Sequence, residues 1–199
     1  MQIDLQEPLV IDSVIFNGKK RLLFEKKESI WLVKVPAQKL AELNRVKIYY
    51  QGKVHQAIRA PWDGGFVWKK DSNGKPFIAS SCQGLGASVW WPNKDHMYDE
   101  VEDMYISVNV PSDLMDVSNG RLLSVKKKKD GTKTYNWYVS NPINNYGVNI
   151  NIGDYVSFSE KYKGEKGILD CNYYVLRNNL AKAKKQFKEV PRMLKAFEY

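Results

Sequence analysis

The sequence predicts a mainly β protein, an antiparallel sandwich or curved sheet with a helical segment at its C-terminal end. Two observations carry this prediction. Short runs of β-branched and aromatic residues are separated by dipeptides typical of tight turns. Beyond residue 177, apolar residues recur at steps of three and four instead of two. We therefore expect a β domain over residues 1–177 and a helical segment over residues 178–199.

Tight turns are indicated by Asn-Gly or Asp-Gly, which tolerate the positive φ that two-residue hairpin turns need. They occur at residues 17–18, 63–64, 73–74, 119–120 and 130–131. Three of them predict hairpins, which join residues 10–16 to 19–24, 66–69 to 77–81, and 122–127 to 132–139. Further strands are predicted over residues 29–35, 46–50, 53–59, 104–110, 155–162 and 168–176. So many short strands favour an antiparallel architecture.

The C-terminal segment has the spacing of an amphipathic helix. Its apolar positions are Leu180, Ala183, Phe187 and Val190. Asn178 or Asn179 is expected to cap its start, and Pro191 is expected to end it and to open a second helix. That second apolar stripe stops at Tyr199, so we expect more protein to follow and an exposed apolar patch near the helix.

The net charge of +9 is concentrated locally. Residues 172–199 contain seven basic and two acidic residues and so supply +5 of it. Four consecutive lysines at 126–129 are predicted to form a charged hairpin tip that discourages edge pairing. A basic chain in which 13% of residues are aromatic leaves open an alternative function, a binding module for nucleic acid or glycan.

Catalytic and metal-binding patterns are missing from the sequence. His55 and His96 do not have zinc-ligand spacing, and there is no Cys-x-x-Cys or Gly-x-Ser-x-Gly motif. The acidic residues between 95 and 103 lack the alternation of a calcium loop and are expected to be solvated. Cys82 and Cys171 are expected to be buried free thiols. We predict no catalytic residue, metal ligand or cofactor in this chain, and no membrane span.

One stretch combines tryptophans with glycines and an amide. Residues 61–68 and 80–96 hold four of the six tryptophans. Glycine lets a backbone approach another group closely, and Gln83 offers a donor and an acceptor that do not titrate. Two interpretations stay open on these residues alone: Gln83 binds a polar ligand group, or the stretch is a tryptophan-rich corner of the core.

Two motifs in this stretch carry a resemblance to a known family. They are Asp-Gly-Gly-Phe-Val-Trp at 63–68 and Cys-Gln-Gly-Leu-Gly-Ala-Ser-Val-Trp-Trp-Pro-Asn-Lys-Asp-His at 82–96. Together they resemble the N-terminal domain of the leukotriene A4 hydrolase-like M1 zinc aminopeptidases, most of all a bacterial branch. The commoner family pattern Ala-Arg-x-x-Phe-Pro-Cys-x-Asp-Glu-Pro is matched at Ala87, Pro92 and Asp95. The sequence departs from it at Ser88, Trp91, Asn93 and His96.

The resemblance covers about residues 5–199, including 117–122 and 187–199. It implies a saddle-like antiparallel β domain that packs on a thermolysin-like catalytic domain. The zinc site of that family, His-Glu-x-x-His, is absent from this sequence. Zinc is therefore expected in an absent catalytic domain, and this chain alone is expected to be inactive. The implied partners are that domain and a peptide N-terminus, without nucleic acid. The compartment stays open, with an exported or periplasmic bacterial protein as one option.

The resemblance also assigns a role to Gln83. The family places a glutamine or glutamate of this domain beside the free amino group of the substrate, and Gln83 occupies the matching position. Gly84 lies next to it, and Ser81 stands where some members have a second glutamine. An amide oxygen is a suitable acceptor for an ammonium group. The resemblance thus implies that Gln83, with Gly84 and Ser81, binds the amino end of a peptide.

Overall fold

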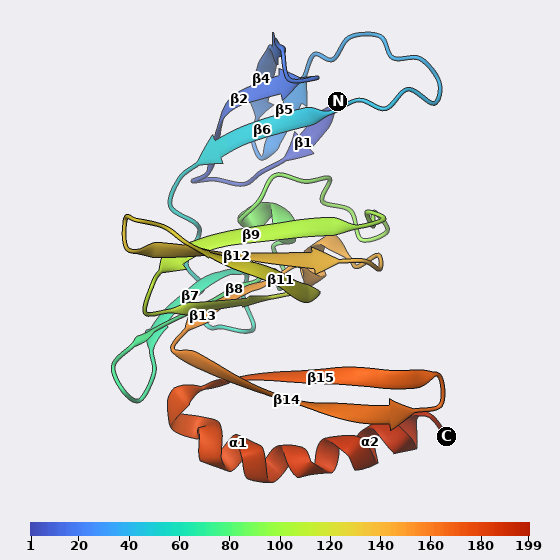
Figure 1. Cartoon of the computed structure of the whole chain (residues 1–199). Helices are drawn as coiled ribbons and strands as arrows, with labels where there is room; N and C mark the ends of the chain where they lie inside the picture. The colour runs from blue at the N-terminus through green and yellow to red at the C-terminus, as the bar shows by residue number, and fades with distance from the viewer. The chain divides into compact units, whose positions relative to one another are not determined.

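The computed structural model describes residues 1–199, of which 47% are in strands and 14% in helices (Figure 1). The prediction of a mainly β protein is confirmed. The chain divides into two compact units that alternate along the sequence. The first unit comprises Met1–Val67, Ala79–Met104 and Tyr138–Asn149. The second comprises Trp68–Ile78, Tyr105–Trp137 and Ile150–Tyr199.

The first unit contains two three-stranded antiparallel sheets, ordered β1-β5-β4 and β3-β2-β6. The strands are β1 (Gln2–Asp4), β2 (Val10–Phe16), β3 (Lys20–Leu22), β4 (Phe24–Lys27), β5 (Ile30–Val33) and β6 (Val46–Gln51). The predicted hairpin at Asn17-Gly18 is confirmed, since both turn residues have positive φ and β2 pairs with β3.

A hydrophobic core joins these strands. It consists of Ile3, Leu5, Leu9, Ile11, Val14, Phe16, Leu22, Trp31 and Val33. In β2, a register shift lies between Ile11 and Ser13. This irregularity adds one residue to the inside-outside alternation, so that Val14 and Phe16 are buried together with Ile11.

The predicted strand over residues 53–59 is wrong. Within it only Gln56 forms an isolated bridge, to Phe66. The carboxylate of Asp63 accepts hydrogen bonds from the backbone N–H groups of Ile58 (2.5 Å) and Arg59 (2.9 Å). These bonds hold the segment in a turned conformation, and a turned backbone cannot form a continuous ladder with a neighbouring strand.

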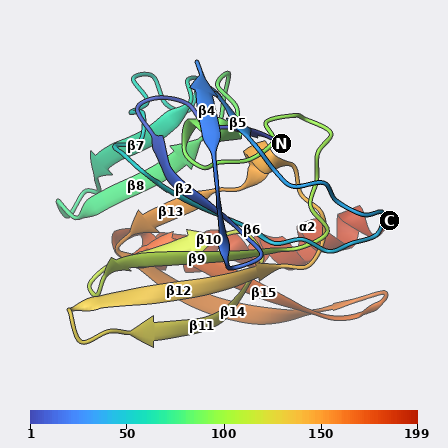
Figure 2. The same ribbon diagram turned by 90° about the horizontal axis from the view of Figure 1, so that it is seen from above.

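The second unit holds most of two further sheets, ordered β10-β13-β8-β7 and β11-β12-β9. In Figure 1, β9, β11 and β12 lie above β7, β8 and β13, and Figure 2 shows the same strands from above. Their strands are β7 (Gly65–Lys70), β8 (Pro76–Ser81), β9 (Met104–Pro111), β10 (Met115–Ser118), β11 (Arg121–Lys127), β12 (Thr132–Val139) and β13 (Ile150–Gly153). The predicted hairpins at Asn73-Gly74 and Asp130-Gly131 are confirmed. Of the four lysines predicted at the tip of the second hairpin, Lys128 and Lys129 lie in the connection, while Lys126 and Lys127 end β11.

The second unit ends in a two-stranded ribbon covered by helices (Figure 1). The ribbon pairs β14 (Tyr155–Gly164) with β15 (Gly167–Leu176), and the helices are α1 (Leu180–Gln186) and α2 (Val190–Phe197). The Phe187 ring between the helices lies 5.0 Å from that of Tyr173. Pro191 stands in the first turn of α2, as predicted. Met193 and Phe197 are exposed, which gives the expected apolar patch.

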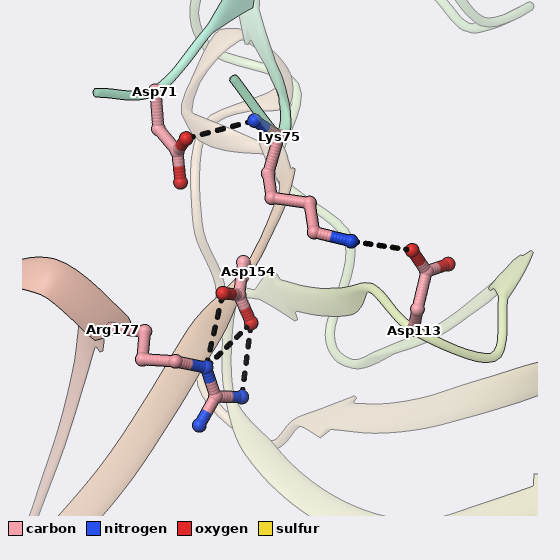
Figure 3. Close-up of polar contacts among 5 residues, drawn as sticks. All are labelled: Asp71, Lys75, Asp113, Asp154 and Arg177. Carbon is pink, nitrogen blue, oxygen red and sulfur yellow. Dashed lines mark hydrogen bonds and ion pairs between the residues drawn. The ribbon is translucent and has the colours of Figure 1, made fainter. Parts of the chain in front are cut away.

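A polar clasp closes the open end of this ribbon (Figure 3). Asp154 precedes β14 and is buried, while Arg177 follows β15. The Arg177 Nε lies 3.0 Å from both Asp154 carboxylate oxygens, and a second guanidinium nitrogen lies 2.9 Å from one of them. The Arg177 backbone N–H also donates to the Asp154 carbonyl (2.9 Å). The clasp therefore fixes the point at which the chain leaves the ribbon for the helices.

No helix in the structure has the length and apolar character needed to cross a bilayer.

Candidate functional site

A pocket of about 590 Å³ lies in the first unit and brings the three predicted site residues together. Ser81 ends β8, and Gln83 and Gly84 follow in the turn after it. All three line the pocket, with Cys82, Asp95 and Tyr146 among the other lining residues. Residues that are distant in sequence thus meet at one concave surface, as a ligand site requires.

Gln83 is exposed, and its side-chain amide makes no hydrogen bond to the rest of the chain. Its backbone N–H lies 3.5 Å from the Ser81 Oγ. The next residue, Gly84, has a φ of +72° with open space around its Cα, so glycine is favoured there by the backbone conformation and not by crowding. The amide oxygen and nitrogen of Gln83 are consequently both available to a ligand.

The two sequence motifs meet behind the Gln83 turn. A Cβ built on Gly64 would lie 3.0 Å from the Gln83 carbonyl oxygen and 2.8 Å from the Leu85 Cβ, so the turn packs directly on this glycine. Two residues further on, the Phe66 ring lies 5.9 Å from the Trp90 ring. Trp90 is buried. The core interpretation therefore applies to Trp90, whereas Gln83 faces solvent and its binding of a polar ligand group stays a prediction.

Asp95 anchors the far end of the turn. Its carboxylate accepts hydrogen bonds from the Ala87 N–H (3.2 Å), the Ser88 N–H (3.1 Å) and the Ser88 hydroxyl (2.6 Å). Gly86 has a φ of +80°, and a Cβ there would collide with this carboxylate. From the sequence Asp95 was expected in a solvated acidic loop. The one signal for its role was its match to the commoner family pattern.

The electrostatics of the pocket favour a cationic ligand group. Asp95 is the only charged residue in the lining. Burial raises the pKa of the Cys82 thiol, which is therefore neutral at physiological pH. The pocket offers one anion and one uncommitted amide, and no activated nucleophile. A charge and a free hydrogen-bonding group at one pocket can together bind a polar, positively charged group.

The other candidates from the sequence do not form a second site. No group of three or more His, Cys, Asp or Glu side chains is arranged to hold a metal ion. Cys82 and Cys171 are both free and only half-buried. In the acidic loop, Asp99 lies 3.2 Å from the Lys94 ammonium, and Glu100 accepts a hydrogen bond from Asn144 (2.8 Å). These carboxylates have local structural partners.

No family model matches this chain, and no curated protein matches it by sequence. Solved structures do match it in fold. An M1 zinc metallopeptidase from Deinococcus radiodurans superposes with a TM-score of 0.73 and 17% identity, over 89% of this chain and 39% of that enzyme. Two related structures give the same TM-score and identity, over 40% of their length. One is a mutant M1 zinc metallopeptidase from this organism bound to a Tyr-Ser-Ala substrate. The other is a mutant of a two-domain M1 zinc metallopeptidase bound to L-arginine.

The chain therefore spans about two fifths of the length of these peptidases. At 17% identity the similarity establishes the fold. The fold expectation that followed from the two motifs is confirmed, including the mainly antiparallel sheets and the C-terminal helices. We conclude that this chain has the fold of a large part of an M1 zinc metallopeptidase.

Proposed function

We propose that this chain is the non-catalytic N-terminal domain of an M1-type zinc metallo-aminopeptidase. In this role it caps the active site and binds the amino end of the peptide substrate. The fold similarity supports the proposal, and so do the two motifs around the Gln83 turn. Zinc and the hydrolytic residues would belong to a catalytic domain outside these 199 residues.

The observation that carries the proposal is the uncommitted amide of Gln83 in a pocket whose only charge is Asp95. A peptide ammonium group needs oxygen acceptors, and the Gln83 Oε1 supplies one. The Asp95 carboxylate adds a negative potential without leaving its own backbone partners. Because an amide does not titrate, the pH dependence of this contact would come from the peptide amino group alone.

The contribution of this chain to the reaction is orientation. When bound in the catalytic domain, zinc would supply an activated water and polarise the scissile carbonyl. Gln83 would hold the ammonium group of the peptide, so that the first peptide bond lies at a fixed distance from the Gln83 side chain. Ser81 and Gly84 shape the wall beside it.

The test uses the full-length enzyme and the substitution Gln83→Ala. Losing one hydrogen bond to a charged group is expected to raise KM by roughly 10- to 100-fold for peptides with a free amino end. A smaller change is expected in kcat. Gln83→Glu should restore binding, since a carboxylate accepts from an ammonium group at least as well. Gln38→Ala, at another exposed glutamine, is the matched control.

Two results would contradict the proposal. One is stoichiometric zinc and peptide turnover by residues 1–199 alone. The other is a KM for Gln83→Ala that equals the wild-type value while Gln38→Ala behaves in the same way.

A further inference from the structure

The second unit contains an apolar pocket of about 760 Å³ that the proposed function does not use. Its walls come from β7, β8, β9 and β13, which belong to the two sheets that lie one above the other in Figure 1. The apolar lining residues are Trp68, Ile78, Val110, Pro111, Leu114 and Ile152. This volume is within the range of pockets that hold small organic ligands.

The charged groups at this pocket are cationic. Lys69 and Lys70 line it, and neither ammonium group forms an ion pair or a hydrogen bond in the structure. The neutral polar residue of the lining, Asn109, donates to the hydroxyls of Thr132 and Thr134 (3.0 Å each).

The neighbouring Asp71 turns one carboxylate oxygen to the hairpin turn, where Oδ1 accepts from the backbone N–H groups of Asn73 (2.8 Å) and Lys75 (2.9 Å; Figure 3). Its Oδ2 is buried without a hydrogen-bond partner. No carboxylate lines the pocket to neutralise the two lysines.

The charge of the whole unit has the same sign. The second unit carries 19 basic and 10 acidic residues, while the first carries 12 of each. The entire net charge of +9 is therefore in the unit that contains the apolar pocket. An anionic ligand is attracted to such a unit, whereas a cationic one is repelled.

We propose that this pocket binds a small amphipathic carboxylate, with an alkyl chain or aromatic ring inside and the carboxylate at the lysines. Trp68 and Lys70 are two residues apart in β7 and so project from the same side of the strand. The Trp68 side chain, 48% exposed, would be covered by the apolar tail. The Lys70 ammonium would then meet the carboxylate at the rim, where it remains partly hydrated. This site is independent of the Gln83 pocket.

The test is calorimetric titration of the chain with hexanoate, octanoate and decanoate below their micellar concentrations. We expect one saturable site. Each added pair of methylenes should raise the affinity by roughly 15-fold, because each buried methylene strengthens binding about fourfold. 1-Octanol should bind at least tenfold more weakly than octanoate, because it has no charge to meet Lys70. A surface that only attracts anions would show no dependence on chain length.

Two variants and two controls locate the site. Trp68→Ala and Lys70→Ala are each expected to weaken decanoate binding by fivefold or more. Trp62→Ala, at an 81% exposed tryptophan of the first unit, and Lys127→Ala, at an exposed lysine of a hairpin, should leave it unchanged. Circular dichroism spectra of all four variants check that the fold is retained.

Several outcomes would overturn the proposal. They are the absence of saturable binding, equal affinity for octanoate and octanol, and binding that survives both Trp68→Ala and Lys70→Ala. Dimerisation of the free chain that Trp68→Ala abolishes would assign the pocket to a protein interface and would equally refute a small-molecule site.

Discussion

Asp116 is a buried carboxylate whose ionisation should make the stability of the second unit depend on pH. It lies in β10 and is completely buried. The Trp137 indole N–H donates to it (2.8 Å), and so does the Ser118 hydroxyl (3.1 Å). Burial raises the pKa of Asp116 from 3.8 to about 6, although these two hydrogen bonds act in the opposite direction. The informative perturbation is Asp116→Asn, which keeps the shape and removes the titration.

The direction in which stability changes with pH follows from proton linkage. Because the pKa of Asp116 is higher in the folded than in the unfolded state, the folded state binds the proton more tightly. Its contribution to stability is fully present below about pH 4 and is lost as the pH rises through about 6. A difference of roughly two pKa units corresponds to about 3 kcal/mol. The advantage of Asp116→Asn over the wild type should therefore grow by about 3 kcal/mol between pH 4 and pH 8.

Urea unfolding at a series of pH values measures this change, because the contributions of other groups cancel in the difference between variant and wild type. The Trp137 indole N–H resonance should titrate with a midpoint near pH 6 in the wild type and not in Asp116→Asn. Asp113→Asn, at an exposed carboxylate of the same unit, is the control and should show no such difference. A stability difference that is constant from pH 4 to pH 8 would refute the reasoning.

Two further predictions concern the anchors of the candidate site and of the helices. Gly86→Ala should destabilise the chain by about 3 kcal/mol in urea unfolding, because alanine is strained at positive φ and its Cβ displaces the Asp95 carboxylate from its donors. Gly84→Ala should cost clearly less, because a Cβ at residue 84 meets open space. Equal losses of stability in the two variants would contradict this account. Arg177→Lys should lower the Tm more than the same change at Arg121, since only Arg177 makes a two-pronged contact with a buried carboxylate.

Local turn chemistry was readable from the sequence because it depends on neighbouring residues only. The Asn-Gly and Asp-Gly turns that have strand patterns on both sides all became hairpins. The strands missed were β1, β4, β10 and β13, each three or four residues long. All of them except β4 have distant partners, as when Met115 pairs with Gly153. A short strand of this kind exists only through its partner, and the sequence does not indicate that partner.

The candidate site was predicted in part. The motif around residues 82–96 singled out Gln83, Gly84 and Ser81, and the structure places them at one pocket. The contributions of Asp95 and of Tyr146 were not predicted. Asp95 stood among other acidic residues, and nothing local separated an anchoring carboxylate from a solvated one. Only the fold brings its oxygens to the N–H groups of residues 87 and 88.

The sequence by itself determined the strand-rich class, the hairpin turns, the two C-terminal helices and the excess of basic residues, since each depends on residue type and short spacing. Tertiary structure decided which polar groups are engaged and which remain available. In the folded chain the Gln83 side-chain amide has no hydrogen-bond partner, and Asp116 is buried and accepts from the Trp137 indole N–H. The whole net charge lies in one of the two units. Those outcomes depend on contacts between residues far apart in the chain, and such contacts exist only once the chain has folded.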